Sequence, residues 1–383
     1  MKSPYFNSEH LLFRQSVREF FQKEIAPHFD EWEEQQQIPR WAWKKMGDMG
    51  YLGLVHQEAY GGSNADFFYS VVFLEELARA GNGGFGCAIS VHEYMALNHI
   101  GRAGSNYLKE KYLAPGIAGD QIAALGVSEP DAGSNVQGIR TSAVLEGDHY
   151  VVNGSKTFIS NGYYADFITT LVKTGDGMSL LVIDAGSEGL HRSKLKKMGW
   201  HASDTAEIQF DNVRVPKENL VGVEGMGFYY IMDSFQLERL VGGILAVGAM
   251  DSILEITLKY MQEREAFGRP IAKYQALRHR IADLTTEVEA CRQLVHHTAW
   301  LYAQGEFAVK ECSMVKLHAA ELQKKVADEC LQMFGGYGYM EDYPICRAYR
   351  DTRVGAIAGG TSEIMREIIA KMVMDDVKYR KAY

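Results

Sequence analysis

The sequence of 383 residues lacks the features that mark several classes of protein. Its five cysteines are scattered and form no C-x-x-C pair, which indicates reduced thiols in a reducing compartment rather than a disulfide-stabilised scaffold. The net charge of -9 and the pI near 5.8, without any basic run, argue against a nucleic-acid partner. Apolar runs are short and broken by charged residues, so we expect no transmembrane helix.

Targeting signals are also missing at the N-terminus. The first residues lead almost directly into an amphipathic segment, with neither the apolar core of a secretory signal nor an arginine-rich transit peptide. We therefore expect a cytoplasmic bacterial protein. A mitochondrial matrix protein whose transit peptide has been removed is the alternative.

Common catalytic motifs are absent or misplaced. No H-E-x-x-H occurs, and His92 and His99 lack a third ligand, so we expect no metal. Neither G-x-x-x-x-G-K-[ST] nor G-x-S-x-G is present, which argues against a nucleoside-triphosphate loop and a hydrolase elbow. Gly81, Gly83 and Gly86 fit G-x-G-x-x-G, but they follow a predicted helix rather than a strand, so we interpret them as a loop.

The sequence contains a helical part, a strand-rich part and a second helical part. Helical patterns cover the stretch from residue 8 towards residue 27, then 65–80, 92–100 and 107–113. Strand-like runs follow at 150–152, 166–173, 179–184 and 206–210, and 153–154 and 175–177 are typical of hairpin turns. Long helical patterns return at 227–264, 274–304, 307–333 and 362–377.

This order predicts an α+β fold with three domains. They are an N-terminal helical domain (1–122), a central antiparallel β domain (123–226) and a C-terminal four-helix bundle (227–383). The glycine-rich segment 221–227 is the expected hinge between the last two.

A carboxylate interrupts the apolar face of the predicted helix at 227–264. That face is formed by residues at helical spacing: Ile231, Phe235, Val241 and Leu245. Glu238 falls on the same face, where a glutamate is rare unless it is paired or has a chemical task. Burial raises the pKa of a carboxyl and suits it to act as a general base. An ion pair, with Arg239 or with an arginine on another helix, is the alternative. Gly242 and Gly243, one turn later, have no side chain to obstruct a flat ligand.

Three stretches rich in small residues indicate a large ligand. Residues 126–135 (GVSEPDAGSN) offer backbone N–H groups to anionic or carbonyl groups, and 154–162 (GSKTFISNG) places aromatic Phe158 two residues before the hydroxyl of Ser160. The glycine pairs in 331–340 (LQMFGGYGYM) and 359–364 (GGTSEI) permit close backbone approach, and Thr361 and Ser362 are suited to cap the next helix. Together these stretches predict a multi-part cofactor cleft between the β domain and the helices.

In combination, the motifs resemble those of the acyl-CoA dehydrogenase flavoprotein family over essentially the full chain. The resemblance is carried by GVSEPDAGSNVQGI (126–139), NGSKTFISNG (153–162), ERLVGG (238–243), REAFG (264–268), QMFGGYGY (332–339) and YRDTRVGAIAGGTSEI (349–364). It implies a helical, β and four-helix-bundle architecture, FAD as cofactor and an acyl-CoA thioester as substrate. It also implies a homotetramer that passes electrons to an electron-transfer flavoprotein.

The resemblance assigns FAD contacts to particular residues. Val127 and Ser128 would lie nearest the flavin ring, Phe158 beside the isoalloxazine, and Ser160 at flavin N5. Arg264, Phe267 and Gln275 would reach the FAD of a neighbouring subunit. The full implied set is Leu125, Val127, Ser128, Gly133, Ser134, Phe158, Ile159, Ser160, Arg264, Phe267, Gln275, Gln332, Gly335, Gly336, Thr361 and Glu363. The implied substrate contacts are Ser134, Arg239, Gly359 and Gly360.

The chain departs from most of the family at Gly359, where a catalytic glutamate is usual in an E-G-T motif. A minority branch, which includes isovaleryl-CoA and long-chain enzymes, carries its base on the first helix of the bundle, and that place matches Glu238. The resemblance therefore implies that Glu238 removes the α-proton while the β-hydrogen leaves as hydride to the flavin, which yields a 2,3-enoyl-CoA. The thioester carbonyl would be held by the backbone N–H of Gly359 and a ribityl hydroxyl.

The resemblance leaves the substrate and the electron acceptor open. Long, branched and citronellyl-type acyl chains are all compatible with it. An acyl-CoA oxidase or a flavin monooxygenase that uses O2 is the alternative on the same fold. A non-catalytic CoA- or lipid-binding scaffold is the alternative of another class.

Overall fold

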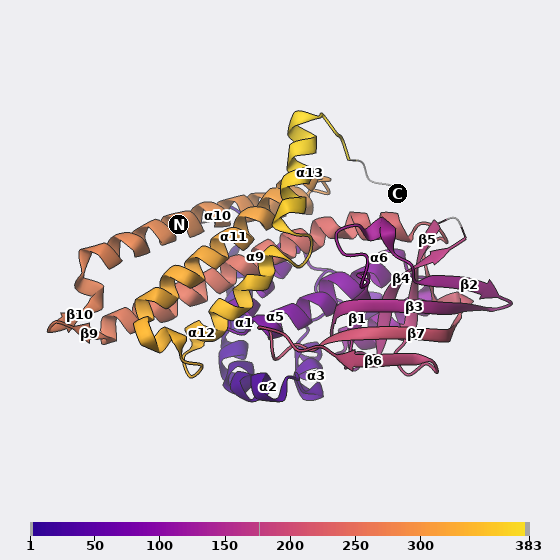
Figure 1. Ribbon diagram of the computed structural model, residues 1–383, viewed down its shortest axis with the longest axis horizontal. Helices are drawn as coiled ribbons and strands as arrows, with labels where there is room; N and C mark the ends of the chain where they lie inside the picture. The colour runs from indigo at the N-terminus through magenta and orange to yellow at the C-terminus, as the bar shows by residue number, and fades with distance from the viewer. Residues whose placement is uncertain (1–2, 176, 380–383) are drawn as a thin grey trace.

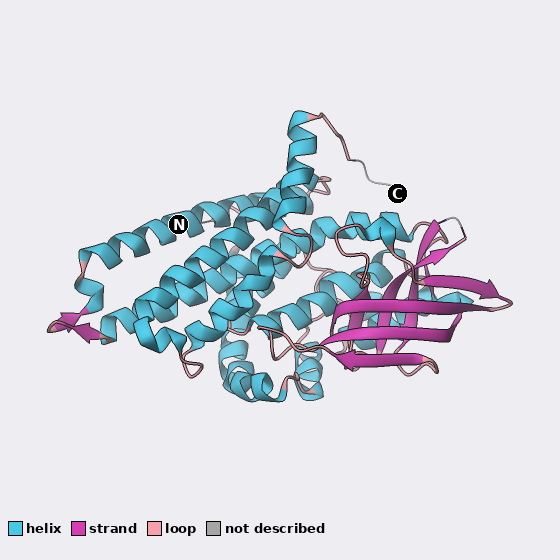
Figure 2. Ribbon diagram, in the orientation of Figure 1, coloured by secondary structure: helices cyan, strands magenta, loops and turns pink. Residues whose placement is uncertain are grey.

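The computed structural model describes residues 3–175 and 177–379. Helices, a sheet and a second set of helices follow one another along the chain, with the large sheet at one end of the molecule and a two-stranded hairpin at the other (Figure 2). The predicted α+β fold is therefore confirmed.

The N-terminal helices surround a core of aromatic and aliphatic side chains. They are α1 (Ser8–Phe20), α2 (Phe29–Gln35), α3 (Arg40–Asp48), α4 (Phe67–Arg79), α5 (Gly83–Ser90), α6 (Leu97–Ala103), α7 (Asn106–Leu108) and α8 (Ala114–Ile117). The helix expected at 92–100 begins as a π-helical segment, Val91–Ala96, before α6. Helices α2 and α3 were not predicted, because they are short. Gly83 and Gly86 lie inside α5, so the interpretation of the glycine motif as a loop is wrong, although the motif follows α4 rather than a strand, as expected.

Within the described residues, eight strands form one sheet (Figure 1). They are β1 (Ala123–Gly126), β2 (Ser142–Glu146), β3 (His149–Ser160), β4 (Phe167–Thr174), β5 (Gly177–Asp184), β6 (Leu190–Lys194), β7 (Thr205–Pro216) and β8 (Leu220–Val221). Their order is β6-β7-β3-β2-β4-β5-β8, with β1 on β4. Most pairs are antiparallel as predicted, but β1 and β2 both run parallel to β4, with Ala123 opposite Phe167 and Ser142 opposite Lys173.

One of the two predicted hairpin turns is wrong. Asn153 and Gly154 lie inside β3, which runs on to Ser160, and the register with β7 shifts between Val152 and Gly154. A Cβ on Gly154 would lie 2.6 Å from the Cα of Thr141, so the glycine permits a close strand crossing instead of a turn. The other prediction is confirmed, since Thr174 pairs with Gly177 across the β4–β5 connection; Asp176 itself lies outside the described residues.

The C-terminal helices are α9 (Gly227–Glu263), α10 (Gln275–Ala303), α11 (Val309–Phe334), α12 (Pro344–Thr352) and α13 (Ser362–Met374). A small hairpin, β9 (Glu265–Ala266) and β10 (Arg269–Pro270), joins α9 to α10. At 37 residues, α9 is about 55 Å long and runs from the β domain to this hairpin (Figure 1). α13 projects from the bundle at the top of the same view.

Helix α9 is long and apolar enough to cross a membrane, with a mean hydropathy of 1.6 in its most apolar window. However, 61% of that window is buried inside the protein. A Cβ on Gly248 would lie 2.2 Å from the carbonyl oxygen of Glu75 on α4, and one on Gly243 would lie 2.1 Å from Val315 on α11. Packing against these two helices therefore accounts for the apolar character of α9.

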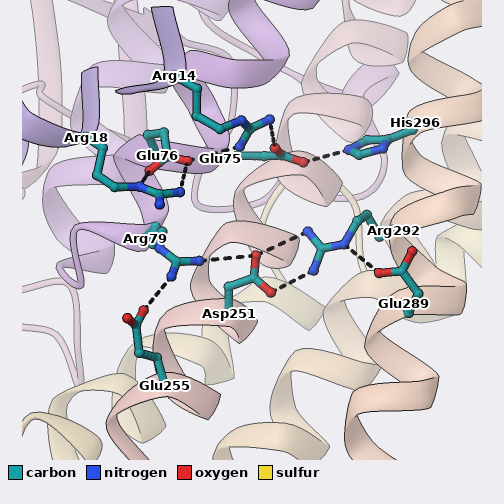
Figure 3. Close-up of polar contacts among 10 residues, drawn as sticks. All are labelled: Arg14, Arg18, Glu75, Glu76, Arg79, Asp251, Glu255, Glu289, Arg292 and His296. Atoms are coloured by element: carbon teal, nitrogen blue, oxygen red, sulfur yellow. Dashed lines mark hydrogen bonds and ion pairs between the residues drawn. The ribbon is translucent and has the colours of Figure 1, made fainter. Parts of the chain in front are cut away.

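A network of charged residues joins the N-terminal helices to the bundle (Figure 3). In its upper part, the buried carboxylate of Glu75 on α4 lies 2.7 Å from Arg14 on α1 and 2.7 Å from His296 on α10. Glu76, also buried, accepts hydrogen bonds from Arg14 at 3.0 Å and from Arg18 at 2.7 and 2.8 Å. Three helices are thus fixed around two adjacent carboxylates.

The lower part of the network connects α4, α9 and α10 (Figure 3). Asp251 on α9 accepts from both terminal nitrogens of Arg292 on α10, at 2.7 and 3.2 Å, and lies 3.7 Å from Arg79 on α4. Arg79 also bonds Glu255, one turn along α9, at 2.6 Å. Partly buried ion pairs of this kind fix the orientation of neighbouring helices more than they add stability.

We predict that Glu76→Ala destabilises the protein by about 2–4 kcal/mol, because it leaves two partly buried guanidinium groups without their shared carboxylate. The matched control is Glu19→Ala, which removes an exposed pair with Lys23 and should leave the unfolding midpoint almost unchanged. Urea denaturation followed by circular dichroism measures both. Equal midpoints for the two variants would contradict the structural role given to Glu76.

Candidate functional site

Glu238 occupies the position on α9 that the helical pattern predicts. Its side chain is 8% exposed, and Oε1 has no hydrogen-bond partner among the described residues. The neighbouring Arg239 is buried too, and its guanidinium lies over the Phe235 ring, 5.7 Å from the centroid. Within the part of the chain that the structure describes, the Glu238 carboxylate forms no ion pair, and Arg239 acts on it through its charge alone. The expected alternative, a structural ion pair, is therefore not formed in this chain.

Burial controls the acidity of Glu238. It raises the pKa of this carboxyl from its ordinary value of 4.5 to about 8, while the charge of Arg239 acts in the opposite direction. Removal from water disfavours the charged form, and one neighbouring cation offsets only part of that effect. The result is a carboxylate that binds a proton tightly near neutral pH, as a general base requires.

Gly242 and Gly243, one turn after Glu238, differ in the space beside them. A Cβ on Gly242 would meet no described atom within 4 Å, so this face of the helix is open, as predicted. The prediction is wrong for Gly243, whose missing side chain makes room for Val315 on α11. Of the two, only Gly242 leaves room for a ligand.

The turn that precedes α13 presents an open backbone. Gly359 has φ +66° and Gly360 has φ +96°, and no described atom lies within 4 Å of a Cβ built on Gly359. Thr361 caps α13 as predicted, because its side chain accepts from the Ile364 N–H at 3.3 Å. The side chain of Glu363, in the first turn of α13, is exposed.

Lys316 on α11 was missed by the sequence analysis. Its buried ammonium donates a hydrogen bond to the carbonyl oxygen of Gly360, which anchors the turn that contains Gly359. Burial, together with the positive charge of Arg239, lowers the pKa of Lys316 to about 8. Lys316 lies among buried small and apolar residues of α11, and the reasoning that singled out Glu238 would have found it.

The predicted flavin contacts of the β domain lie on β1, the loop after it and the end of β3. Val127 and Ser128 are half-buried, whereas Gly133 and Ser134 are exposed. Leu125, in β1, is half-buried. The Thr157 N–H donates to the Ser128 carbonyl at 2.9 Å, which places the loop directly against β3.

At the end of β3, an irregularity turns an aromatic ring outwards. The register with β7 shifts between Lys156 and Ile159, and Phe158, at φ +60°, is 72% exposed. Ile159 is buried, and the Ser160 hydroxyl accepts a contact from the Cys87 thiol at 3.7 Å. An exposed ring beside a hydroxyl and open glycine backbone fits a flat aromatic cofactor.

A second group of predicted cofactor contacts lies at the far tip of the bundle. A groove of about 560 Å³ is lined in part by Arg264, Gln332, Gly335 and Gly336. Gln275 is exposed at the start of α10, and Phe267, in the β9–β10 hairpin, is 98% exposed. The Phe267 ring therefore meets solvent almost entirely in the isolated chain.

The two groups are not brought together within one chain. They lie at different levels of α9: Ser160 contacts Cys87 on α5, and Gly86 beside it faces Leu245 midway along α9, whereas the groove includes Tyr260 and Arg264 at the end of the helix. The stretch from Leu245 to Tyr260 spans roughly 22 Å at 1.5 Å per residue. The groove at the bundle tip includes none of the β-domain residues, so these two groups do not line one groove within a single chain. The cofactor motifs of the two groups are far apart in the sequence. Their order along the chain does not predict the distance between them in the folded protein.

We predict that Glu238→Gln stabilises the protein at alkaline pH. Between about pH 4.5 and 8 the folded chain holds a proton on Glu238 that the unfolded chain releases, so the stability of the neutral form is full below 4.5 and is lost as the pH rises towards 8. A glutamine stays neutral, so the variant should gain roughly 2–4 kcal/mol at pH 8.5 and little at pH 5. Thermal and urea unfolding at the two pH values measure this gain. A gain independent of pH would show that Glu238 is not a high-pKa carboxyl.

Comparisons with known proteins agree with this geometry. Models of the N-terminal, middle and C-terminal domains of acyl-CoA dehydrogenase match residues 7–120, 124–213 and 225–374. The long-chain specific acyl-CoA dehydrogenase of Mus musculus is 40% identical over 97% of this chain and 88% of its own length, and the isovaleryl-CoA dehydrogenase of Pongo abelii is 36% identical over 95% and 88%.

Solved structures give the same result. An acyl-CoA dehydrogenase from Geobacillus kaustophilus is 42% identical, with a TM-score of 0.94 over 97% of this chain and 100% of its own. A glutaryl-CoA dehydrogenase from Mycobacterium smegmatis, solved in complex with FADH2, is 28% identical, with a TM-score of 0.93 over 98% and 97%. The chain belongs to the acyl-CoA dehydrogenase family, a family of oxidoreductases.

Proposed function

We propose that this protein is an FAD-dependent acyl-CoA dehydrogenase that converts an acyl-CoA thioester into the 2,3-enoyl-CoA. The observation that carries the proposal is Glu238, a buried carboxylate without an ion-pair partner among the described residues, with a pKa raised to about 8 and open helix surface at Gly242. When bound, FAD accepts the β-hydrogen of the substrate as a hydride.

The residues around Glu238 have distinct tasks in this proposal. Glu238 takes the α-proton, and its low solvation keeps it basic enough to do so. The N–H of Gly359, in a turn open to ligand, binds the thioester carbonyl, where negative charge develops. Lys316 holds that turn through Gly360, and Arg239 places a positive charge beside the base.

The cofactor site is proposed to need two copies of the chain. The β-domain contacts around Phe158 lie beside the middle of α9, whereas the bundle-tip contacts around Phe267 lie beyond its end, and the groove at the tip includes none of the β-domain contacts. Both surfaces expose an aromatic ring, and a symmetric assembly brings the tip of one copy to the β domain of another. We therefore propose a homo-oligomer, a homotetramer in its complete form.

The substrate is proposed to be a long-chain or branched-chain acyl-CoA. The support is the placement of the base on α9, which leaves the space beside Gly359 free of a side chain. Electrons pass to an electron-transfer flavoprotein in this proposal, in the cytoplasm of a bacterium or in the mitochondrial matrix. Transfer to O2 is the competing outcome, and its signature is peroxide.

We predict that Glu238→Gln lowers turnover by roughly 10³-fold or more while FAD stays bound, because the α-proton then has no acceptor. Anaerobic bleaching of the flavin absorbance across straight and branched acyl-CoAs measures the loss and identifies the preferred chain. Glu255→Gln, an exposed glutamate of the same helix, is the matched control. Unchanged bleaching by Glu238→Gln would remove Glu238 from the mechanism. Absence of flavin from the purified unaltered chain would favour a scaffold over an enzyme.

We predict that two cofactor-deficient variants restore FAD binding when co-expressed. Phe158→Asp and Phe267→Asp each replace an exposed phenylalanine at positive φ, so neither change disturbs the core. Each variant alone should lose most of its FAD. In a mixed assembly, one site combines the intact β domain of one chain with the intact tip of the other, so about a quarter of all sites should recover at random mixing. Flavin content per chain measures the recovery, and its absence would contradict a site shared between subunits.

A further inference from the structure

A fully buried lysine lies beneath the loop that carries Val127 and Ser128. The side chain of Lys156, on β3, has no exposed surface, and its ammonium donates to the Val127 carbonyl at 3.1 Å and to Glu129 Oε1 at 2.8 Å. Burial lowers the pKa of Lys156 to about 8, although Glu129 acts to raise it. A cation is thus kept in the interior of the β domain with one carboxylate as its counter-ion.

Glu129 connects both ends of the same loop. Its carboxylate, 6% exposed as a residue, accepts from the Arg140 N–H at 2.5 Å and the Thr141 N–H at 3.0 Å as well as from Lys156. The backbones of Glu129 and Ala132 bond each other, at 3.0 and 3.1 Å, which closes a tight turn. The Glu129 carboxylate therefore ties the start of the loop to the backbone at Arg140 and Thr141 and to the Lys156 ammonium.

The pair also fixes the loop relative to β3. Lys156 holds the Val127 carbonyl, and the next residue of β3, Thr157, donates its N–H to the Ser128 carbonyl at 2.9 Å. Phe158 and Ser160 follow directly on the same strand. The two stretches proposed to contact the flavin are thus placed relative to each other through one buried side chain.

A buried ion pair is a poor source of stability, because the loss of hydration offsets most of the attraction between the charges. Neutral side chains of similar size would stabilise the fold as well or better. The specific property of Lys156 is that one ammonium satisfies a main-chain carbonyl and a carboxylate at the same time, which a neutral aliphatic side chain cannot do.

We propose that Lys156 and Glu129 form a positioning pair for the cofactor, which holds loop 127–134 in its flavin-binding shape against Phe158 and Ser160. This inference rests on the proposed FAD site and adds to it two residues that do not touch the cofactor themselves. The outward side of the loop, with Gly133 and Ser134 exposed, remains free to meet the ligand.

The test compares Lys156→Met with the double variant Lys156→Met/Glu129→Gln. The single change leaves the Glu129 carboxylate without its cation, so it should lower the unfolding midpoint and weaken FAD binding. The double variant removes both charges, and the single amide oxygen of glutamine replaces one of the two carboxylate oxygens that accept from the Arg140 and Thr141 N–H groups. It should therefore recover part of the unfolding midpoint that the single variant loses. Its FAD dissociation constant should still be raised at least about tenfold, because methionine cannot donate to the Val127 carbonyl.

The control variant is Asp251→Asn, which disrupts an ion-pair network remote from the loop in sequence and on other elements. It should lower the unfolding midpoint and leave the FAD dissociation constant unchanged. The second readout is hydrogen exchange in the cofactor-free chain. Exchange at the Glu129 and Ala132 amides should accelerate in both Lys156 variants and not in Asp251→Asn.

A double variant that binds FAD as tightly as the unaltered chain, with slow exchange in the loop, would show that the pair contributes stability alone and would overturn the inference. If the unaltered chain binds no FAD, the proposed function fails instead. The exchange measurement still decides in that case whether the pair fixes the loop, because it needs no cofactor.

Discussion

The close packing of α9 is the constraint on which the rest of the structure depends. One side of this helix meets α4 at Gly248, where a Cβ would lie 2.2 Å from a backbone oxygen, and another meets α11 at Gly243. A helix held on two sides cannot turn about its axis, so Glu238 is kept in a poorly solvated position. Its raised pKa is a consequence of that packing, and the ion pairs of Asp251 with α4 and α10 prevent the helix from sliding.

Three buried charged sites in this chain differ in how many of their polar atoms have hydrogen-bond partners. Lys156 and Glu129 satisfy each other and several backbone groups, which suits them to hold a shape. Lys316 satisfies one carbonyl and lies near a second cation, so it anchors a turn at some electrostatic cost. Glu238 has an oxygen without a hydrogen-bond partner among the described residues, which leaves it available to a substrate. These three sites therefore differ in the number of polar atoms that the surrounding protein satisfies.

Periodicity predicted the long helices and the burial of Glu238, because a helical face repeats within a few residues and needs no knowledge of distant contacts. It failed at Asn153-Gly154, where a glycine serves a close approach to Thr141, a contact that local turn rules cannot contain. Lys156 was missed because its partners lie on another element, whereas Lys316 lies on a buried helical face where the same periodicity indicates it. The separation of the cofactor motifs along α9 depends on how the domains pack, which the sequence pattern does not contain. The domain boundaries and the roles of the site residues stay predictions.

The left-handed backbone of Gly359 restricts which residues can replace this glycine. At φ +66° a residue with a Cβ is disfavoured by about 1–2 kcal/mol, although the space around it is open. A glutamate introduced here would find room for its side chain but would strain the turn that Lys316 holds. Placing a carboxylate in this turn is thus a coupled change of backbone and side chain, which a single substitution at Gly359 would not complete.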